Sequence, residues 1–455
     1  MRADLLLPLA VLLCSACPLP RGDDDDRGDD DDAADDDDST SGGQIDAVLA
    51  LLESEANAEI VDARIVEVGR TARWPLQEGG RWLFVTRWAE ASAVSLVGDH
   101  QGWDIAATPA SAAATGVHWW VIEEDGAVGT SEGARFKWYR PADGGVYDAR
   151  EEATAYGFDE FGLFAYLRPP LDRSWRERFP GWSSAALPPP RTVRTLLPAG
   201  FAPQGSAASR ARTLLLHDGQ NVFHPDAFFG GWRVDEALAA SPDGSDVVVV
   251  AVDNASDRFD ACTHTGDDPF DDGAMIGGQA DAYLDWLNDE VLPFARDRYG
   301  VEAQGASLAM AGSSLGGLVT LQAARRWDDG LGCAAALSPT LGWGAFAASG
   351  AEALVNLWET SPGHGSTPVF LYSGGSQGSG CVDSDGDGVL EDSDDSDNYC
   401  VTTQLRDRLE ALGYAFDVDL AHWWAPGEPH NEAAWAAQVP RLLEFCASAG
   451  WAAPP

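Results

Sequence analysis

From residue 191 to the end, short apolar runs alternate with segments of helical spacing. The runs are TVRTLLP, RTLLLHDG, DVVVVAVDN, LAMAGSS, CAAALSP, PVFLYSGG and FDVDLAH. In most of these runs the apolar residues are consecutive, which is typical of strands buried on both faces of a mostly parallel sheet. The clearest helical segment is 280–299, in which Pro293 predicts a kink. The alternation predicts a layered α/β domain from 191 to 455.

The chain before this domain has a different pattern. The runs RWLFVTRW, AVSLVGDHQGW, HWWVIEE and ARFKWYR are rich in aromatic and β-branched residues and are separated by turn residues. This pattern predicts a small all-β, immunoglobulin-like sandwich. With one leading helix that starts at Ile45, the sandwich is expected to occupy 45–170. Residues 171–190, rich in Pro, Arg and Trp, are interpreted as a linker.

The N-terminus has the features of an export signal. An apolar run too short to span a bilayer, LLLPLAVLLCSAC, follows Arg2 and ends in small residues before Cys17. Residues 1–17 resemble a bacterial lipoprotein signal, in which Cys17 is lipidated and anchors the protein to the outer membrane or cell surface. Ordinary secretion with cleavage nearby is the alternative.

An acidic segment follows the signal, and the chain as a whole is strongly acidic. Twelve aspartates lie between Asp23 and Asp38, so 18–44 is expected to be an extended, disordered tether. The net charge of −44 repels phosphate backbones and argues against a nucleic-acid partner.

The segment 312–316, GSSLG, fits the pattern G-x-S-x-G between an expected strand and an expected helix. This is the context of a nucleophile elbow, which would expose the Ser314 hydroxyl at the carboxyl edge of the sheet. Ser313 does not have the required spacing from the glycines. The alternative is a turn filled with small residues.

A serine nucleophile needs a base and, in this class of site, an acid that lies between the two in the chain. His430 follows the last expected strand in a loop before a helix, which is where the base belongs. His422 is expected to be structural and His364 to face solvent. The acid is predicted to be Asp397, just before a helix, with Asp383 as the second choice.

Two backbone N–H groups are candidates for the oxyanion site. One belongs to Leu315, directly after the serine, and the other to Gln220 in LLLHDGQN, where Gly219 lets the backbone turn inward. His217 in the same segment is expected to be structural. Catalysis of this kind requires no cofactor.

The loop between Cys381 and Cys400 has the spacing of a calcium-binding loop. Its acidic side chains at positions 1, 3, 5, 9 and 12 are Asp383, Asp385, Asp387, Glu391 and Asp394. A structural calcium ion in an insertion at 381–400 is therefore predicted, closed by a Cys381–Cys400 disulfide as expected of an exported protein. The alternative is an exposed acidic loop. Cys333 is expected to be a buried free thiol.

As a set, several segments resemble the putative esterase family of α/β-hydrolases, which includes enterochelin esterases, feruloyl esterases and bacterial mycolyltransferases. They are LLLHDGQNVF, GWRVDEAL, VVVVAVDN, GGQADAYLDWLNDEVLPFARDRYG, MAGSSLGGL, ALSPTLGW and PHNEAAW. The resemblance implies an α/β-hydrolase domain with Ser314 as nucleophile, His430 as base, and Gln220 and Leu315 as oxyanion donors, and it supports Asp397. WLFVTRWAEASAVSLVGDHQGWD is similar to the sandwich that precedes the catalytic domain in enterochelin esterases.

The predicted function is a serine carboxylic-ester hydrolase that works through an acyl-enzyme. Its partner would be a small-molecule ester: a siderophore, feruloyl or similar ester. Two alternatives stay open: an exported glycan- or siderophore-binding protein with an inactive hydrolase fold, and an acyltransferase.

Overall fold

The computed structural model describes residues 43–454 with short gaps. The gaps are 55–56, 90, 92, 113–115, 124–130, 142–144, 206–209, 224–226, 228, 243, 328–329, 348–349, 360–364, 377, 379 and 392–396. The expected signal (1–17, with Cys17), nearly all of the tether (18–44), His364 and Asp394 lie outside the described residues.

Two helices open the described chain, where the sequence predicts one. They are α1 (Gln44–Glu53) and α2 (Ala58–Thr71). The Asn57 side chain accepts a hydrogen bond from the Glu59 N–H and so caps α2. Ile45, Val48 and Val61 bury their side chains with those of a small antiparallel sheet, so both helices cover its outer face.

The small sheet is one half of a sandwich. Its order is β1-β2-β5-β4, with the bounds β1 (Leu76–Glu78), β2 (Arg81–Arg87), β4 (Ser111–Ala112) and β5 (Val117–Glu123). The facing strands are β3 (Ser95–Gly98), β6 (Arg135–Arg140), β7 (Val146–Asp148), β8 (Ala155–Asp159) and β9 (Gly162–Tyr166). Between the two lie Phe84, Phe136 and Trp138, which form an aromatic core with edge-to-face contacts.

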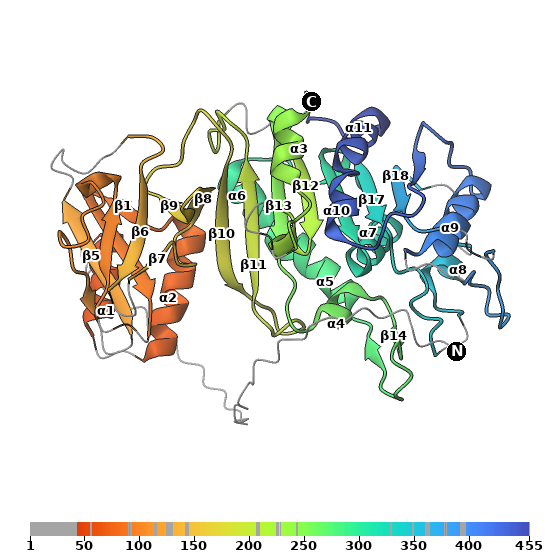
Figure 1. Cartoon of the computed structure of the whole chain (residues 1–455), viewed down its shortest axis with the longest axis horizontal. Helices are drawn as coiled ribbons and strands as arrows, with labels where there is room; N and C mark the ends of the chain where they lie inside the picture. Colours follow the sequence, from red (N-terminus) through yellow and green to blue (C-terminus); the bar gives the residue numbers. More distant parts are fainter. Residues whose placement is uncertain are drawn as a thin grey trace, which may run out of the picture.

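The facing strands belong to a large sheet that continues into the second part of the chain. Strand β10 (Trp175–Trp182) pairs antiparallel with β8 on one side and with β11 (Arg191–Leu197) on the other (Figure 1). The segment 171–190 is therefore not a free linker as expected, since it holds a central strand. The charged residues of β10 do not have the apolar pattern that predicts a buried strand. Glu177 is nevertheless buried, because Arg73 and Arg298 form ion pairs with it.

The second part is built on parallel strands in the order β13-β12-β16-β17-β18-β19. Their bounds are β12 (Arg212–His217), β13 (Val247–Val252), β16 (Leu308–Ser313), β17 (Cys333–Leu337), β18 (Val369–Ser373) and β19 (Leu420–Trp424). Strands β12, β13 and β16 each have six residues, and all of them are buried, as expected for strands covered on both faces of the sheet.

Helices cover both faces of this sheet (Figure 1). On one side are α3 (Val234–Ala240), α10 (Glu432–Ala436) and α11 (Val439–Ala449). On the other are α4 (Arg258–Cys262), α5 (Ala280–Trp286), α6 (Leu292–Tyr299), α7 (Leu315–Arg326), α8 (Leu354–Glu359) and α9 (Tyr399–Ala411). A short hairpin, β14 (Gly266–Asp267) and β15 (Ile276–Gly277), projects from this side. A π-helical turn, Leu287–Val291, joins α5 to α6 just before Pro293, which has no N–H to donate.

Two disulfides form among the described cysteines. Cys381 bonds Cys400 as predicted, whereas Cys333 bonds Cys446 and is not the free thiol expected from the sequence. Cys333 lies on β17, against which α11 packs, and only this packing brings Cys446 to it. Of the described cysteines, Cys262 is the free thiol, and its burial raises its pKa to about 12.

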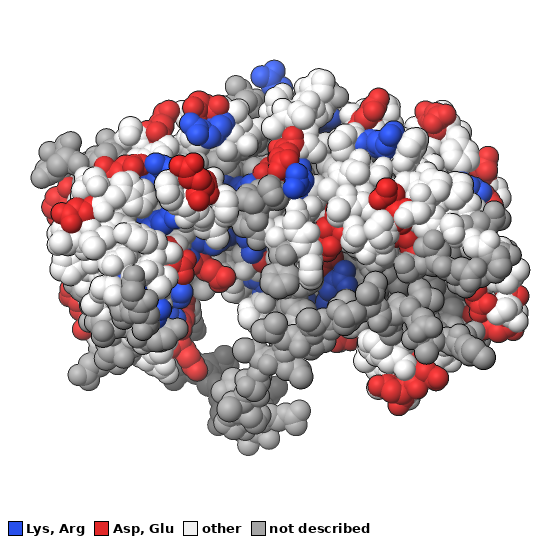
Figure 2. Space-filling view, viewed as in Figure 1, with Lys and Arg blue, Asp and Glu red and all other residues white. Residues whose placement is uncertain are grey.

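Disulfides are typical of proteins in oxidising compartments. Among the described residues, no helix combines the length and the apolar character needed to cross a membrane. Figure 2 shows acidic side chains spread over the face in view, with basic ones interspersed.

Candidate active site

The predicted site residues collect where the parallel strands end. Ser314 directly follows β16, Asp218 and Gly219 follow β12, and Gly374 follows β18. His430 lies between β19 and α10. Because the strands are parallel, their carboxyl ends share one edge of the sheet, the usual place for a site in this kind of fold.

Ser314 occupies a strained turn between β16 and α7. Its φ of 55° and ψ of −122° lie in a region that residues with a side chain rarely adopt. The turn is held by the Ser314 N–H, which donates to the Leu337 carbonyl at 2.9 Å. Gly312 and Gly316 touch across the turn, and a Cβ on Gly312 would collide with the Gly316 backbone. Only glycine fits there, which explains the spacing in the sequence motif.

The Ser314 hydroxyl has a polar neighbour that sequence reasoning missed. Its Oγ lies 3.2 Å from Oγ1 of Thr340, and the Thr340 N–H donates to the Ser314 carbonyl at 3.2 Å. Thr340 lies three residues after the end of β17, the strand that pairs with β16. A polar residue just beyond the neighbouring strand could have been predicted to lie near Ser314.

Asp397 and His430 lie side by side although 33 residues separate them. The His430 Nδ1 is 3.0 Å from Oδ1 of Asp397, which is fully buried. The other oxygen of Asp397 accepts the Gly374 N–H. A carboxylate acceptor at Nδ1 gives the tautomer that carries its proton there and leaves Nε2 free to accept one. The Trp435 ring holds the imidazole edge-on, with ring centres 5.0 Å apart.

The second candidate acid lies elsewhere. Asp383 is exposed and accepts N–H groups of its own loop, those of Gly386, Asp387 and Gly388. Among the described residues, Ser314 and His430 form no hydrogen bond with each other: the Ser314 hydroxyl contacts Thr340, and the His430 ring contacts Asp397. Catalytic hydrogen bonds of this kind often form only with substrate bound.

The two expected oxyanion donors flank this edge. Leu315 is the first residue of α7, where N–H groups have no partner within the helix. Gln220 lies in a short 3₁₀ turn, Gly219–Asn221, and its side-chain oxygen accepts the Asn254 N–H at 3.0 Å. A Cβ on Gly219 would lie 2.8 Å from Oδ1 of Asp253 and 2.9 Å from the Val252 carbonyl carbon, so the close approach needs glycine.

Comparison with known proteins identifies the family. Residues 184–450, more than half of the chain, match the family model described as "Putative esterase". The chain belongs to the putative esterase family. Membership confirms the predicted α/β-hydrolase fold and makes this protein a carboxylic ester hydrolase.

More distant likenesses to this esterase occur among solved structures. One is the siderophore hydrolase EstA from Aspergillus nidulans, with 19% identity, coverage of 59% of this chain and 94% of that one, and a TM-score of 0.42. Another is the enterobactin esterase FES from Shigella flexneri, with 13% identity, coverage of 80% and 93%, and a TM-score of 0.41. No curated protein sequence matches the chain.

Two other histidines of the esterase have structural surroundings. His217 is buried with Nδ1 3.0 Å from the Tyr283 hydroxyl, and burial lowers its pKa to about 4. The His422 Nε2 lies 2.9 Å from the Ser373 hydroxyl, and burial likewise lowers its pKa to about 4. Both rings are neutral at pH 7 and remain internal hydrogen-bond partners.

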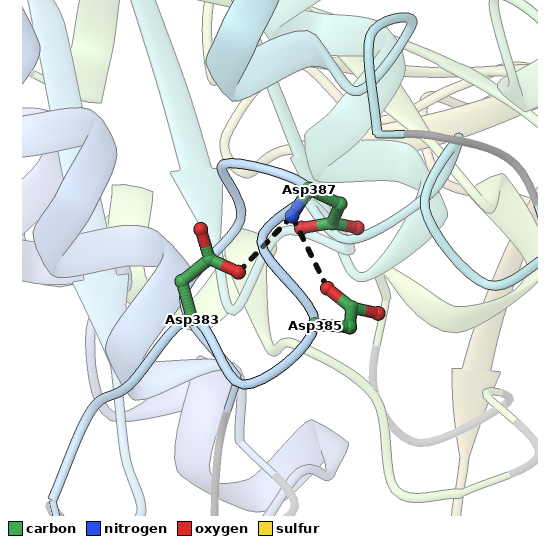
Figure 3. A group of neighbouring side chains, drawn as sticks. All are labelled: Asp383, Asp385 and Asp387. Atoms are coloured by element: carbon green, nitrogen blue, oxygen red, sulfur yellow. Dashed lines mark hydrogen bonds between the residues drawn. The ribbon is translucent and has the colours of Figure 1, made fainter.

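The acidic loop of the esterase brings three of the predicted metal ligands together. One carboxylate oxygen each of Asp383, Asp385 and Asp387 lies within 4.8 Å of the others (Figure 3). Burial and the neighbouring carboxylates raise the pKa of Asp387. Two predicted ligands remain. Glu391 accepts a hydrogen bond from the Ser384 hydroxyl, and Asp394 lies outside the described residues.

The loop rests on the helix that follows the candidate acid. Gln404 of α9 accepts the Leu390 N–H at 2.9 Å and donates to the Gly388 carbonyl at 2.7 Å. Both glycines of the DGDG segment have positive φ, 82° for Gly386 and 84° for Gly388. The donor set, carboxylates only, suits a hard cation such as Ca²⁺.

Proposed function

We propose that the protein is a serine esterase that hydrolyses its substrate through an acyl-enzyme. The observation that carries the proposal is the strained backbone of Ser314, at the sheet edge to which the Asp397–His430 pair also belongs. Strain of this kind persists only where the surroundings impose it, and it exposes the hydroxyl at a helix N-terminus.

In the proposed first step, the Ser314 Oγ forms a bond to the ester carbonyl carbon and its proton passes to Nε2 of His430. Asp397 accepts the Nδ1–H and stabilises the imidazolium that forms. The negative charge on the carbonyl oxygen is bound by the N–H groups of Gln220 and Leu315.

The intermediate then collapses. The bond from the carbonyl carbon to the alkoxy oxygen breaks, and the proton on His430 passes to the leaving alcohol. Water repeats the sequence in the second step, with His430 as its base, and releases the acid and free Ser314.

The expected substrates are siderophore, feruloyl or similar esters, as the sequence resemblance implies. A panel of siderophore lactones, feruloyl sugars and short aryl esters tests this choice. Transfer of the acyl group to an alcohol in place of water would reveal an acyltransferase.

Labelling with a fluorophosphonate tests the nucleophile. The wild type should be labelled, and Ser314→Ala should lose both the label and at least a factor of about 10⁴ in kcat. Ser313→Ala is the matched control, because Ser313 is buried in β16, and it should keep the label. A wild type that hydrolyses no ester and takes no label would favour a binding protein with an inactive fold.

We also propose that the loop 383–391 binds a structural Ca²⁺ and that Cys17 carries a lipid anchor in an exported protein. The clustered carboxylates support the first, and the two disulfides support export. Detergent phase partition of the wild type and Cys17→Ala tests the anchor: the wild type should enter the detergent phase and the variant should not.

A further inference from the structure

Asp218 holds a strained position at the end of β12. Its φ of 54° and ψ of 47° are left-handed, which few residues other than glycine adopt. Gly219 and Gln220 follow directly, so the backbone angles of Asp218 determine how the turn that carries the Gln220 N–H leaves the strand. Asp tolerates this region better than most residues with a side chain, and contacts that hold its carboxylate stabilise the turn further.

Arg258 of α4 holds the Asp218 carboxylate with two hydrogen bonds. Nε donates to Oδ1 at 2.8 Å and Nη2 to Oδ2 at 2.9 Å, while Asn254 Nδ2 also donates to Oδ1 at 2.7 Å. Burial alone would raise the pKa of Asp218, but its neighbours, Arg258 first and also Asn254 and His217, together outweigh this effect and the pKa is lowered. The carboxylate therefore stays charged and oriented, because a paired Arg–carboxylate contact fixes both groups in one plane.

The same network reaches both expected oxyanion donors. The Asn254 N–H donates to the Gln220 side chain at 3.0 Å, which holds the far end of the loop. On the opposite side, a Cβ on Gly316 would lie 3.3 Å from Oδ2 of Asp218, so the carboxylate packs against the first turn of α7. Leu315, directly before Gly316, carries the other donor.

We propose that Arg258, acting through Asp218, is a positioning residue that fixes the Gln220 N–H relative to the Leu315 N–H. The inference rests on the proposed function, since it assigns Arg258 to the oxyanion site of that reaction. Donors of an oxyanion site are effective when they are in place before charge develops. A loosened loop should therefore weaken binding of the transition state more than binding of the substrate.

Two variants test the proposal. Arg258→Lys keeps the charge but loses the planar guanidinium that fixes both carboxylate oxygens in one plane. Asn254→Ala removes one hydrogen bond at an exposed residue, where folding should be unaffected. We expect kcat to fall about 10- to 100-fold in Arg258→Lys with KM within about threefold of the wild type. The Ki of a boronic acid, which mimics the tetrahedral intermediate, should rise by the factor by which kcat/KM falls. Asn254→Ala should show the same pattern more weakly.

Arg212→Lys is the matched control. Arg212 is also buried and pairs with Asp246 at 2.7 Å, but at the amino ends of β12 and β13, the opposite edge of the sheet. It should lower thermal stability and leave kcat and the boronate Ki unchanged. If Arg258→Lys and Asn254→Ala behave like this control, the positioning role is refuted. Full activity of Ser314→Ala would instead refute the proposed function.

Discussion

Replacing Asp397 by Asn tests the proposed acid with a change of one atom. The side chain keeps its size, so the buried site should still be filled. The Asn side chain loses the negative charge and one hydrogen-bond acceptor. In the wild type both oxygens of Asp397 are needed, because one accepts from the His430 ring and the other from the Gly374 N–H.

The expected loss follows from these two contacts. A hydrogen bond to a charged group contributes about 1.5–3 kcal/mol, and the bond to His430 is made to an imidazolium in the transition state. In the variant, the Asn oxygen can serve His430 or Gly374 but not both. If it serves Gly374, the amide NH₂ faces His430 and favours the tautomer that cannot act as a base. We therefore expect kcat to fall about 10³- to 10⁴-fold, or about 4–5 kcal/mol.

The assay is hydrolysis of an aryl ester by folded protein, with thermal melting to show that the variant is folded. Asp407→Asn is the control, since Asp407 lies on α9 with an exposed carboxylate, and it should keep full activity. Asp383→Asn tests the second candidate acid. A folded Asp397→Asn enzyme that loses less than tenfold in kcat would refute the assignment of the acid, and a larger loss in Asp383→Asn would transfer it.

Three further predictions concern stability and can be read by urea or thermal unfolding. Burial would raise the pKa of Glu177, but Arg73, Arg298 and the Tyr299 hydroxyl lower it to about 2, below the ordinary 4.5. This shift contributes about 3 kcal/mol to the free energy of unfolding, which is fully present above pH 4.5 and is lost as the pH falls toward 2. Glu177→Gln should therefore destabilise strongly at pH 7, and its difference from wild type should shrink over that window; a constant difference contradicts the ion-pair account. Ca²⁺ at a hundred times its Kd should raise Tm by several degrees in the wild type but not in Asp385→Ala, and an equal rise in both would exclude the loop as the site. Replacing Cys333 and Cys446 by Ser should cost about 3–5 kcal/mol, more than removal of the other disulfide, because their loop spans 113 residues against 19; equal costs would argue against a loop-length effect.

Local patterns in the sequence were enough to predict the parallel strands and the turn at Ser314. Strands buried on both faces must be apolar along their length, and the turn between β16 and α7 needs glycine on both sides of the serine. The expected fold and family followed from such patterns, because each depends on residues that are close together in the chain.

Pairings between distant segments came only from the tertiary structure. Strand β10 was not predicted because its charged residues conceal a buried strand until Arg73 and Arg298 are brought to Glu177. The partner of Cys333 depended on where α11 packs. From the sequence, Asp397 was the first and Asp383 the second candidate for the acid beside His430. The path of the chain into α9 places Asp397 against the His430 ring. These outcomes depend on contacts across more than thirty residues, which a local pattern does not encode because the interacting side chains meet only after the sheet has assembled.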